Sequence, residues 1–381
     1  MNEAHERLDA VIAGIVSEIG ATAAQYAVAV DGRVVLGRSF GAATAHSRFC
    51  LFSASKPVFA FLVLRLVGEG RLDLDAPVAA LWPEFGVGGK ERITLAQLLT
   101  FSAGIPSFWP DEAAVLDADL RAAQLAALPI ETEPGTAYAY HPVSAHWVLA
   151  ELVRRVTGLD HAEALNTLVL DPLGVDRMRL GPAVEDQGDV QRVAAVGEYD
   201  LPLAEAMLGV RLTAAQLDAL NAPVLAIAND PRVMAAGTPG GGIVSDAASA
   251  ALFYQALLHG DERLWPDALR RRALVEIGNG LVDTARGGAP ANRTIGSLTV
   301  AGEDVPQLAY PELGFAAPVR HHGTRTSPRT VGHAGFGGQL AFADPDRGYS
   351  FAFVSNGLER NHRHGVRRDR EIADAVADAF A

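Results

Sequence analysis

Strand-forming patterns lie at both ends of this sequence, and helix-forming patterns fill its middle. The β-rich runs 26–30 and 33–36 flank Asp31-Gly32, which is a strong signal for a tight hairpin. Residues 339–354 repeat the arrangement around a turn that contains proline and glycine. The simplest architecture brings both ends together in one sheet, with a helical region inserted between them.

Apolar residues recur at helical spacing in several segments, of which residues 57–67 are apolar throughout apart from Arg65. The predicted helices cover residues 4–19, 57–67, 94–100, 143–157 and 369–380. Gly68 and Gly70 mark the end of the apolar helix, because glycine favours the left-handed conformation that stops a helix.

These patterns predict an α/β fold of the α+β kind, an antiparallel sheet flanked by helices. We expect residues 1–74 and 236–381 to form this domain, and residues 75–235 to form the inserted, mostly helical region. Residues 276–306 are rich in Gly, Ala, Asn and Thr, and we predict a mobile loop there.

The charge of the chain argues against two classes of partner. Of its 381 residues, 49% are hydrophobic and 20% are charged, and the formal net charge is −13. This composition is that of a globular protein. An acidic surface repels phosphate backbones and anionic lipids, so we expect neither nucleic acid nor a membrane as partner.

The start of the sequence and its cysteine usage favour a cytoplasmic protein. Residues 1–7 lack the basic start and apolar run of a signal peptide. Cys50 is the only cysteine, so the chain forms no internal disulfide.

The first candidate catalytic group is Ser53-Ala54-Ser55-Lys56. Residues three apart share one face of a helix, which places the Lys56 amine beside the Ser53 hydroxyl. A serine needs an adjacent base to become a nucleophile. Burial and the positive end of the helix lower the pKa of a lysine at this position, which makes it a feasible base.

Two further motifs carry residues suited to chemistry. Tyr140 ends the loop that follows Pro134-Gly135, and it can exchange a proton if a nearby cation lowers its pKa. Residues 331–338 are rich in glycine and adjoin a strand, so their backbone can approach a ligand closely and offer an N–H to an oxyanion. His333 in this segment is a candidate donor to substrate.

The order of these three motifs resembles that of the β-lactamase-like serine hydrolases: class C β-lactamases, D-Ala-D-Ala peptidases and related esterases. The resemblance extends over nearly the whole chain. Residues 93–106 resemble the family's segment LLxHxSGLP, from which Phe101 and Ala103 depart. Residues 240–245 resemble its Gly-rich approach to a later helix, and Phe342-Ala343-Asp344-Pro345 is also typical.

The resemblance implies a role for each motif. Ser53 forms an acyl-enzyme, while Lys56 and Tyr140 move the proton from Ser53 to the leaving group and later activate water. The backbone amides of Ser53 and Phe336 form the oxyanion hole, and His333 and Gly335 adjoin the substrate. No cofactor and no metal ion are expected.

The Tyr motif favours an esterase within this family. Lactamases and peptidases of the family usually carry Tyr-x-Asn, whereas this chain has Tyr140-His141-Pro142. Proline offers no side-chain hydrogen bond to a substrate amide. Residues 140–151 resemble the pattern YHAxTxGWLxGE of family VIII carboxylesterases, and His333 replaces the lysine of Lys-Thr-Gly. We therefore predict a small-molecule carboxylic ester as substrate.

Other interpretations remain open at this point. Acyl transfer and a β-lactamase or D-Ala-D-Ala peptidase activity would use the same site. A metal hydrolase would use histidines such as His321-His322 and His362-x-His364, although no carboxylate lies at a standard zinc spacing beside them. A non-catalytic ligand-binding protein is the third alternative. The residues considered for a substrate pocket are Trp109, His141 and Trp147.

Overall fold

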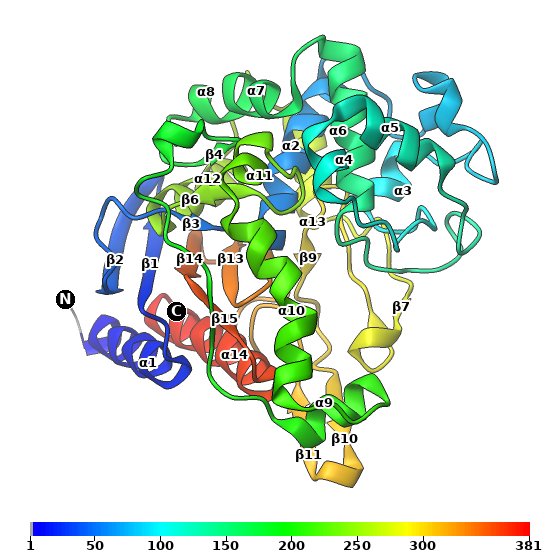
Figure 1. Cartoon of the computed structure of the whole chain (residues 1–381). Coiled ribbons are helices and arrows are strands. Elements are labelled where there is room, and N and C mark those ends of the chain that lie inside the picture. Colours follow the sequence, from blue (N-terminus) through cyan, green and yellow to red (C-terminus); the bar gives the residue numbers. More distant parts are fainter. Residues whose placement is uncertain (1–2) are drawn as a thin grey trace.

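The computed structural model describes residues 3–381, apart from the side chain of residue 312, and it centres on a six-stranded antiparallel sheet (Figure 1). The strand order is β2-β1-β14-β13-β12-β9. The strands are, in that order, Arg33–Gly41, Ala23–Val30, Tyr349–Ser355, Gln339–Asp344, Val331–Gly335 and Thr299–Val300. The sheet therefore joins the two ends of the chain through the pairing of β1 with β14.

Both predicted hairpins are present in this sheet. β1 pairs with β2 through a turn in which Asp31 has φ 49° and Gly32 has φ 72°. Two left-handed residues of this kind match the twist of a two-residue hairpin, which explains the Asp-Gly pair. β13 pairs with β14 through the second turn.

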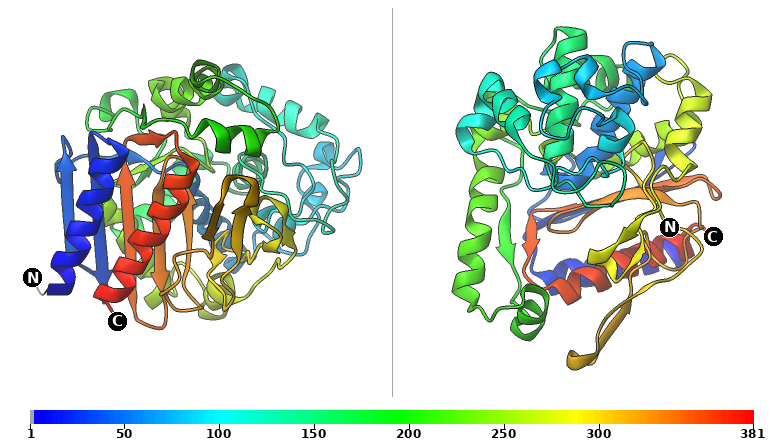
Figure 2. Two further views of the ribbon diagram at one scale, coloured as in Figure 1. Left: turned by 90° about the horizontal axis from the view of Figure 1, so that it is seen from below. Right: turned by 90° about the vertical axis from the view of Figure 1, so that its right-hand side faces the viewer.

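The two faces of the sheet carry side chains of different size. Large side chains, including Phe342, Phe351 and Phe353, pack against α1 (Glu3–Ile19) and α14 (His362–Ala379). Small ones, such as Ala341 and Ala352, lie in the core shared with α2 (Ser55–Gly68) and α12 (Ala247–His259), because small residues let a helix approach closely. Figure 2 shows α1 and α14 side by side on one face of the sheet, with the helical region beyond the other face.

The middle of the chain is mostly helical. Its helices are α3 (Leu95–Leu99), α4 (Glu112–Leu116), α5 (Ala118–Ala127), α6 (Ser144–Thr157), α7 (His161–Leu165), α8 (Asp171–Leu173), α9 (Leu201–Leu208), α10 (Ala214–Asn229) and α11 (Pro231–Ala236). It also supplies β4 (Arg179–Leu180), which pairs with β6 (Ile243–Ser245), and β5 (Ala194–Val196), which pairs with β15 (Gly357–Glu359). The domain boundaries at residues 75 and 235 stay a prediction.

Two expectations about local structure need correction. The last helix begins at His362 rather than at residue 369. Asn361 caps this start, because its side chain accepts hydrogen bonds from the backbone N–H groups of Arg363 and His364. Residues 276–306 are not simply a loop. They contain β7 (Val282–Asp283), β8 (Ala289–Pro290) and β9, the edge strand of the main sheet, and they follow α13 (Asp267–Val275). The remaining short strands are β3 (Phe49–Cys50) and the pair β10 (Gln307–Tyr310) and β11 (Phe315–Pro318).

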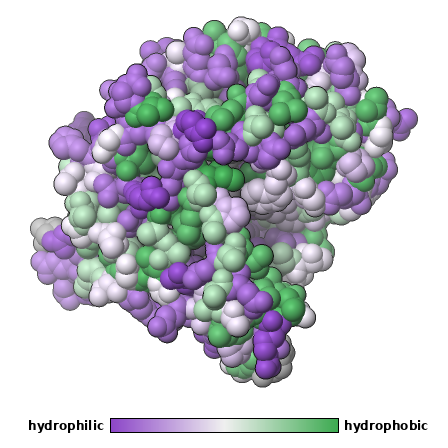
Figure 3. All heavy atoms as spheres, in the orientation of Figure 1, coloured by the Kyte–Doolittle hydropathy of each residue, from purple (hydrophilic) through white to green (hydrophobic). Residues whose placement is uncertain are grey.

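Hydrophilic and hydrophobic residues are interspersed over the face of the molecule in Figure 3. Within residues 3–381, no helix combines the length and the apolar character that crossing a membrane requires.

Candidate active site

Ser53 lies in a single 3-10 turn, Phe52–Ala54, between β3 and the first residue of α2. Phe52 has φ 45°, a left-handed conformation that is unfavourable for a bulky side chain. Strain of this kind persists only where the surrounding structure enforces it, and it is frequent beside reactive groups. Ser53 is half-buried, so its hydroxyl remains accessible while the helix after it is buried.

The Lys56 amine is held against Ser53. Its Nζ lies 3.0 Å from Ser53 Oγ and donates a second hydrogen bond, of 2.8 Å, to the carbonyl oxygen of Gly240. The side chain has no exposed surface. Burial, reinforced by the charge of Arg293, holds the pKa of Lys56 well below its usual range. These surroundings therefore disfavour protonation of the amine, and a base requires an unprotonated amine.

Tyr140 lies next to this amine. Lys56 Nζ is 5.1 Å from the centroid of its ring, and the Phe101 ring meets it edge-on at 5.1 Å. Burial raises the pKa of Tyr140 to about 12, against the opposing effects of Arg293 and of the Ser53 hydroxyl. The two hydroxyls are thus neighbours, although Tyr140 Oη makes no hydrogen bond of good geometry within the described chain. Tyr140 keeps its proton at neutral pH.

Arg293 is the member of this group that the sequence did not reveal. Its guanidinium lies 5.0 Å from the Phe101 ring and 5.5 Å from the Tyr140 ring, and it donates to Tyr138 Oη at 3.2 Å. The side chain is 6% exposed, and its Nη1 has no partner among the described residues. Arg293 is therefore a fixed positive charge that disfavours protonation of Lys56 and favours ionisation of Tyr140.

Replacing Arg293 by glutamine should move the pH profile of turnover. Without the guanidinium charge, the pKa of Lys56 and that of Tyr140 both rise, so both limbs of kcat/KM against pH shift to higher pH. Arg293→Lys keeps the charge and should restore most of the original profile. The measurement is kcat/KM across pH for the three proteins. Superimposable profiles for wild type and Arg293→Gln would contradict this electrostatic role.

The end of β12 closes the site next to Ser53. A Cβ on Gly335 would overlap the carbonyl oxygen of Leu51, so only glycine lets this strand lie against the turn that carries Ser53. The next residue, Phe336, is half exposed, and its ring meets that of Phe52 edge-on with centroids 6.1 Å apart. The backbone of Phe336 is thereby held close to the Ser53 turn.

Substitution of Gly335 by alanine should damage both stability and turnover. The added methyl group forces β12 away from Leu51, which costs about 1–3 kcal/mol as overpacking does elsewhere. The same displacement moves the Phe336 amide, so kcat should fall more than KM rises. Thermal unfolding and steady-state kinetics check this. Gly188→Ala is the control, because its Cβ would meet nothing within 4 Å and its backbone is not in the left-handed region. Equal losses in the two variants would refute the close-approach argument.

His333 lies on β12 with its ring centroid 6.0 Å from that of Tyr140. Its Nδ1 donates to the Ala334 carbonyl oxygen at 2.6 Å, which leaves Nε2 as a buried acceptor without a partner in the described chain. Burial, followed by the charges of Arg293 and Lys56, holds the pKa of His333 well below its usual range. His333 is therefore a neutral acceptor at this site rather than a cation.

The three residues considered for a pocket lie in different surroundings. His141 is buried, and both ring nitrogens are occupied: Nδ1 donates to Ala139 O at 2.5 Å and Nε2 accepts from Ile105 N–H at 3.1 Å. Trp147 has no exposed surface and stacks on Arg121 at 3.9 Å within the core. Trp109 is 65% exposed at the surface.

The histidines considered for a metal site do not converge. Among the described residues, no three His, Cys, Asp or Glu side chains are grouped closely enough to hold a metal ion. Instead, His322 bonds to Thr299, and His364 lies 3.6 Å from Glu359.

Comparison with known proteins identifies the family to which the chain belongs. The sequence model of the family described as Beta-lactamase matches residues 8–376, and the chain belongs to this family. It is a serine hydrolase of the β-lactamase family, as the order of its motifs predicted.

Several relatives are described as esterases. The chain is 28% identical over 326 residues to the esterase/beta-lactamase LipL of Mycobacterium tuberculosis, with 83% of this chain and 70% of LipL covered. It is 34% identical over 199 residues to the esterase EstB of Burkholderia gladioli, covering 44% of this chain and half (50%) of EstB.

Solved structures share the whole fold. The structure of EstA from Arthrobacter nitroguajacolicus Rue61a superposes with a TM-score of 0.77 at 25% identity, covering 100% of this chain and 97% of the other. A penicillin-binding protein homologue from Caulobacter crescentus gives a TM-score of 0.76 at 26% identity, covering 99% and 98%. A family VIII carboxylesterase gives 0.72 at 25% identity, covering 96% and 97%.

Proposed function

We propose that this protein is a carboxylesterase that works through an acyl-enzyme on Ser53. The observation that carries the proposal is the Lys56 amine, which lies 3.0 Å from Ser53 Oγ and whose protonation is disfavoured by burial. An adjacent base turns a serine hydroxyl into a nucleophile. The substrate is a small-molecule ester, and no cofactor takes part in the proposed steps.

In the acylation step, Ser53 Oγ bonds to the carbonyl carbon of the ester as its proton passes to Lys56 Nζ. The carbon–oxygen bond to the alcohol then breaks, and the departing oxygen takes a proton from Tyr140 Oη. Tyr140 recovers a proton from the Lys56 ammonium, so the acyl-enzyme and a neutral alcohol result. A tyrosine with a pKa of about 12 still holds the proton that this step needs at neutral pH.

Hydrolysis of the acyl-enzyme runs through the same groups in reverse. Water takes the place of the alcohol and gives its proton to Lys56 through Tyr140, and Ser53 Oγ leaves with a proton. An oxyanion forms in both steps, and we assign the backbone N–H groups of Ser53 and Phe336 as its hydrogen-bond donors. Neither N–H group donates a backbone hydrogen bond in the described chain. Donors fixed in advance stabilise the developing charge without reorganisation.

Three features favour an ester over an amide or lactam. Pro142 provides no side-chain group to bind a substrate amide. His333 is a neutral acceptor, so it does not attract the carboxylate that β-lactams carry. The relative EstB is described as an esterase and one solved neighbour as a family VIII carboxylesterase, whereas LipL is described as both an esterase and a beta-lactamase.

Replacing Tyr140 by phenylalanine should lower kcat/KM roughly 10²- to 10⁴-fold, because general acid catalysis contributes about that much. The loss should be smaller for p-nitrophenyl esters than for alkyl esters, since p-nitrophenolate departs without a proton. The matched control is Tyr138→Phe, which removes a hydroxyl that accepts a hydrogen bond from Arg293. Equal losses with both leaving groups would argue against Tyr140 as the acid.

The substrate class is tested with a panel measured on one preparation. We expect p-nitrophenyl acetate and butyrate to be hydrolysed, with kcat/KM at least about 10²-fold above that for the chromogenic cephalosporin nitrocefin or a D-Ala-D-Ala peptide. Higher kcat/KM for the lactam or the peptide would replace the esterase assignment by that activity. Products from an added alcohol, resolved by chromatography, report acyl transfer through the same acyl-enzyme.

A further inference from the structure

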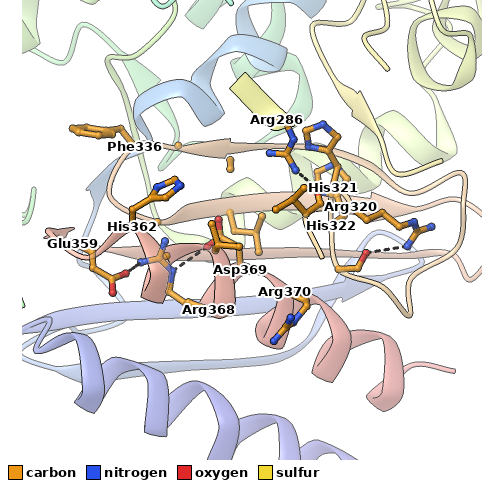
Figure 4. Close-up of a pocket in the computed structure, with 18 of the residues that line it drawn as sticks. Arg286, Arg320, His321, His322, Phe336, Glu359, His362, Arg368, Asp369 and Arg370 are labelled. Carbon is orange, nitrogen blue, oxygen red and sulfur yellow. Dashed lines mark hydrogen bonds and ion pairs between the residues drawn. The ribbon is translucent and has the colours of Figure 1, made fainter. Parts of the chain in front are cut away.

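A second cavity lies on the reverse side of the strand that closes the active site. Its volume is about 310 Å³ (Figure 4). Successive side chains of a strand point to opposite faces. The His333 side chain faces Tyr140, whereas Ala334 lines the cavity, which extends along the backbone of Gly335 and Phe336. Segments 286, 318–323 and 361–370 supply much of the remaining wall.

The net charge of the residues that line this cavity is positive, whereas the net charge of the whole chain is negative. Its charged lining residues are four arginines and two acids: Arg286, Arg320, Arg368, Arg370, Glu359 and Asp369. Both acids already pair with Arg368, at 2.5 and 3.0 Å. The lining thus keeps an excess of positive charge in a protein whose net charge is −13.

Arg286 and Arg370 are the lining arginines that make no ion pair among the described residues. The one hydrogen bond of Arg286 goes to the carbonyl oxygen of Val319. By contrast, Arg320 already donates hydrogen bonds to the carbonyl oxygens of Gly302, Gly323 and Thr326. Figure 4 shows Arg286 and His321 at one side of the cavity and His362 across from them.

A buried acceptor without a partner lines the same cavity. Thr299 Oγ donates to Gly332 O, so it accepts from His322 Nε2–H, and the lone pair of His322 stays on Nδ1. His322 is 7% exposed, and its Nδ1 has no partner in the described chain. An unsatisfied buried acceptor costs free energy that a donor on a ligand would recover. The cavity therefore offers cationic donors together with one acceptor.

The N-terminal end of α14 adds to the positive electrostatic potential of the cavity. Asn361, His362, Gly365 and Val366 line the cavity, so the positive end of an 18-residue helix faces it. Anions bind at such helix ends when nearby side chains also provide donors.

We propose that this cavity is a second binding site, separate from the catalytic one, for a small molecule that carries a phosphate or carboxylate group together with a hydroxyl. Arg286 donates hydrogen bonds to the anionic oxygens, and His322 Nδ1 accepts a hydrogen bond from the hydroxyl group. Monoprotonated inorganic phosphate has both features and is the simplest probe. The ligand contacts the reverse side of the backbone whose Phe336 amide is assigned to the oxyanion hole.

Isothermal titration of the full chain with inorganic phosphate, and separately with citrate, tests this at constant ionic strength. We expect saturable binding of one equivalent, with the tighter anion showing which group the site prefers. Arg286→Gln should weaken binding about tenfold or more, as loss of a charged hydrogen bond does. Arg329→Gln is the control: it removes the same charge from an exposed residue that pairs with Asp346 outside the cavity.

Two further variants keep the test decisive. Arg286→Lys retains the charge if Arg286→Gln does not fold, and it should bind more weakly than wild type. Protein with Ser53 blocked by a fluorophosphonate should bind phosphate unchanged. Absence of saturable binding for both anions, or equal affinity in wild type and the Arg286 variants, would overturn the proposal. Loss of binding after Ser53 is blocked would overturn the separation of the two sites.

Discussion

Ester turnover should fall roughly 10⁴- to 10⁶-fold when Ser53 is replaced by alanine. The remaining site can still bind an ester and polarise its carbonyl, but it lacks the oxygen that forms the covalent intermediate. The rate should approach that of the uncatalysed reaction, and no rapid first turnover of p-nitrophenyl ester should be seen. Ser53 is half-buried, and its Oγ accepts a hydrogen bond from Lys56 Nζ, so the fold should survive this change.

The control for Ser53→Ala is Ser55→Ala, the same chemical change two residues along. Ser55 Oγ accepts from the backbone N–H of Ile243, so its loss should cost about 1 kcal/mol of stability and leave kcat/KM largely intact. Stopped-flow measurement of released p-nitrophenol separates the two variants. Turnover by Ser53→Ala at the wild-type rate would exclude the proposed mechanism.

Replacing Lys56 by methionine should remove activity and at the same time stabilise the protein. Methionine fills a similar volume without a base, so kcat/KM should fall roughly 10³- to 10⁴-fold. Burial holds the pKa of Lys56 below 10.5, its value in the unfolded chain, so the unfolded state binds more protons between the two values. Stability at neutral pH is reduced accordingly, and it rises as pH increases toward 10.5.

Each unit by which the pKa of Lys56 falls below its unfolded value costs about 1.4 kcal/mol at a pH below both values. Methionine removes this cost, so the free energy of unfolding at pH 7 should increase and should lose part of its dependence on pH. The matched control is Lys90→Met, the other lysine of the chain, which is also buried but donates to Leu128 O away from Ser53. Lys90→Met should keep its esterase activity. A destabilised Lys56→Met protein would contradict a lysine that is costly to bury.

The candidate catalytic residues could be proposed from the sequence because the motifs that contain them are short and local. Ser53 and Lys56 share a helix face at a spacing of three, and the apolar run after them predicts that the lysine is buried. The order of motifs along the chain then indicated which tyrosine and which glycine-rich strand to pair with them. Their convergence in the structure follows from the sheet, since β12 lies directly against the turn that carries Ser53.

Arg293 could not be predicted in this way because its position depends on long-range packing. It lies in residues 276–306, where no apolar period marks an element, and it reaches Tyr140 and Phe101 only after β9 joins the sheet. The seven residues added at the start of α14 were missed for a related reason. They are mostly polar and include Gly365, so helical periodicity fails there, although Asn361 as a cap was a usable signal.

The most direct test of the account combines intact-mass spectrometry with a fluorophosphonate probe, in wild type and in Lys56→Met across pH. A single adduct located on Ser53 is predicted, which forms rapidly at neutral pH in wild type and very slowly in Lys56→Met at every pH. An adduct on another residue, or equal labelling rates in the two proteins, would contradict the claim that a proton-poor Lys56 activates Ser53.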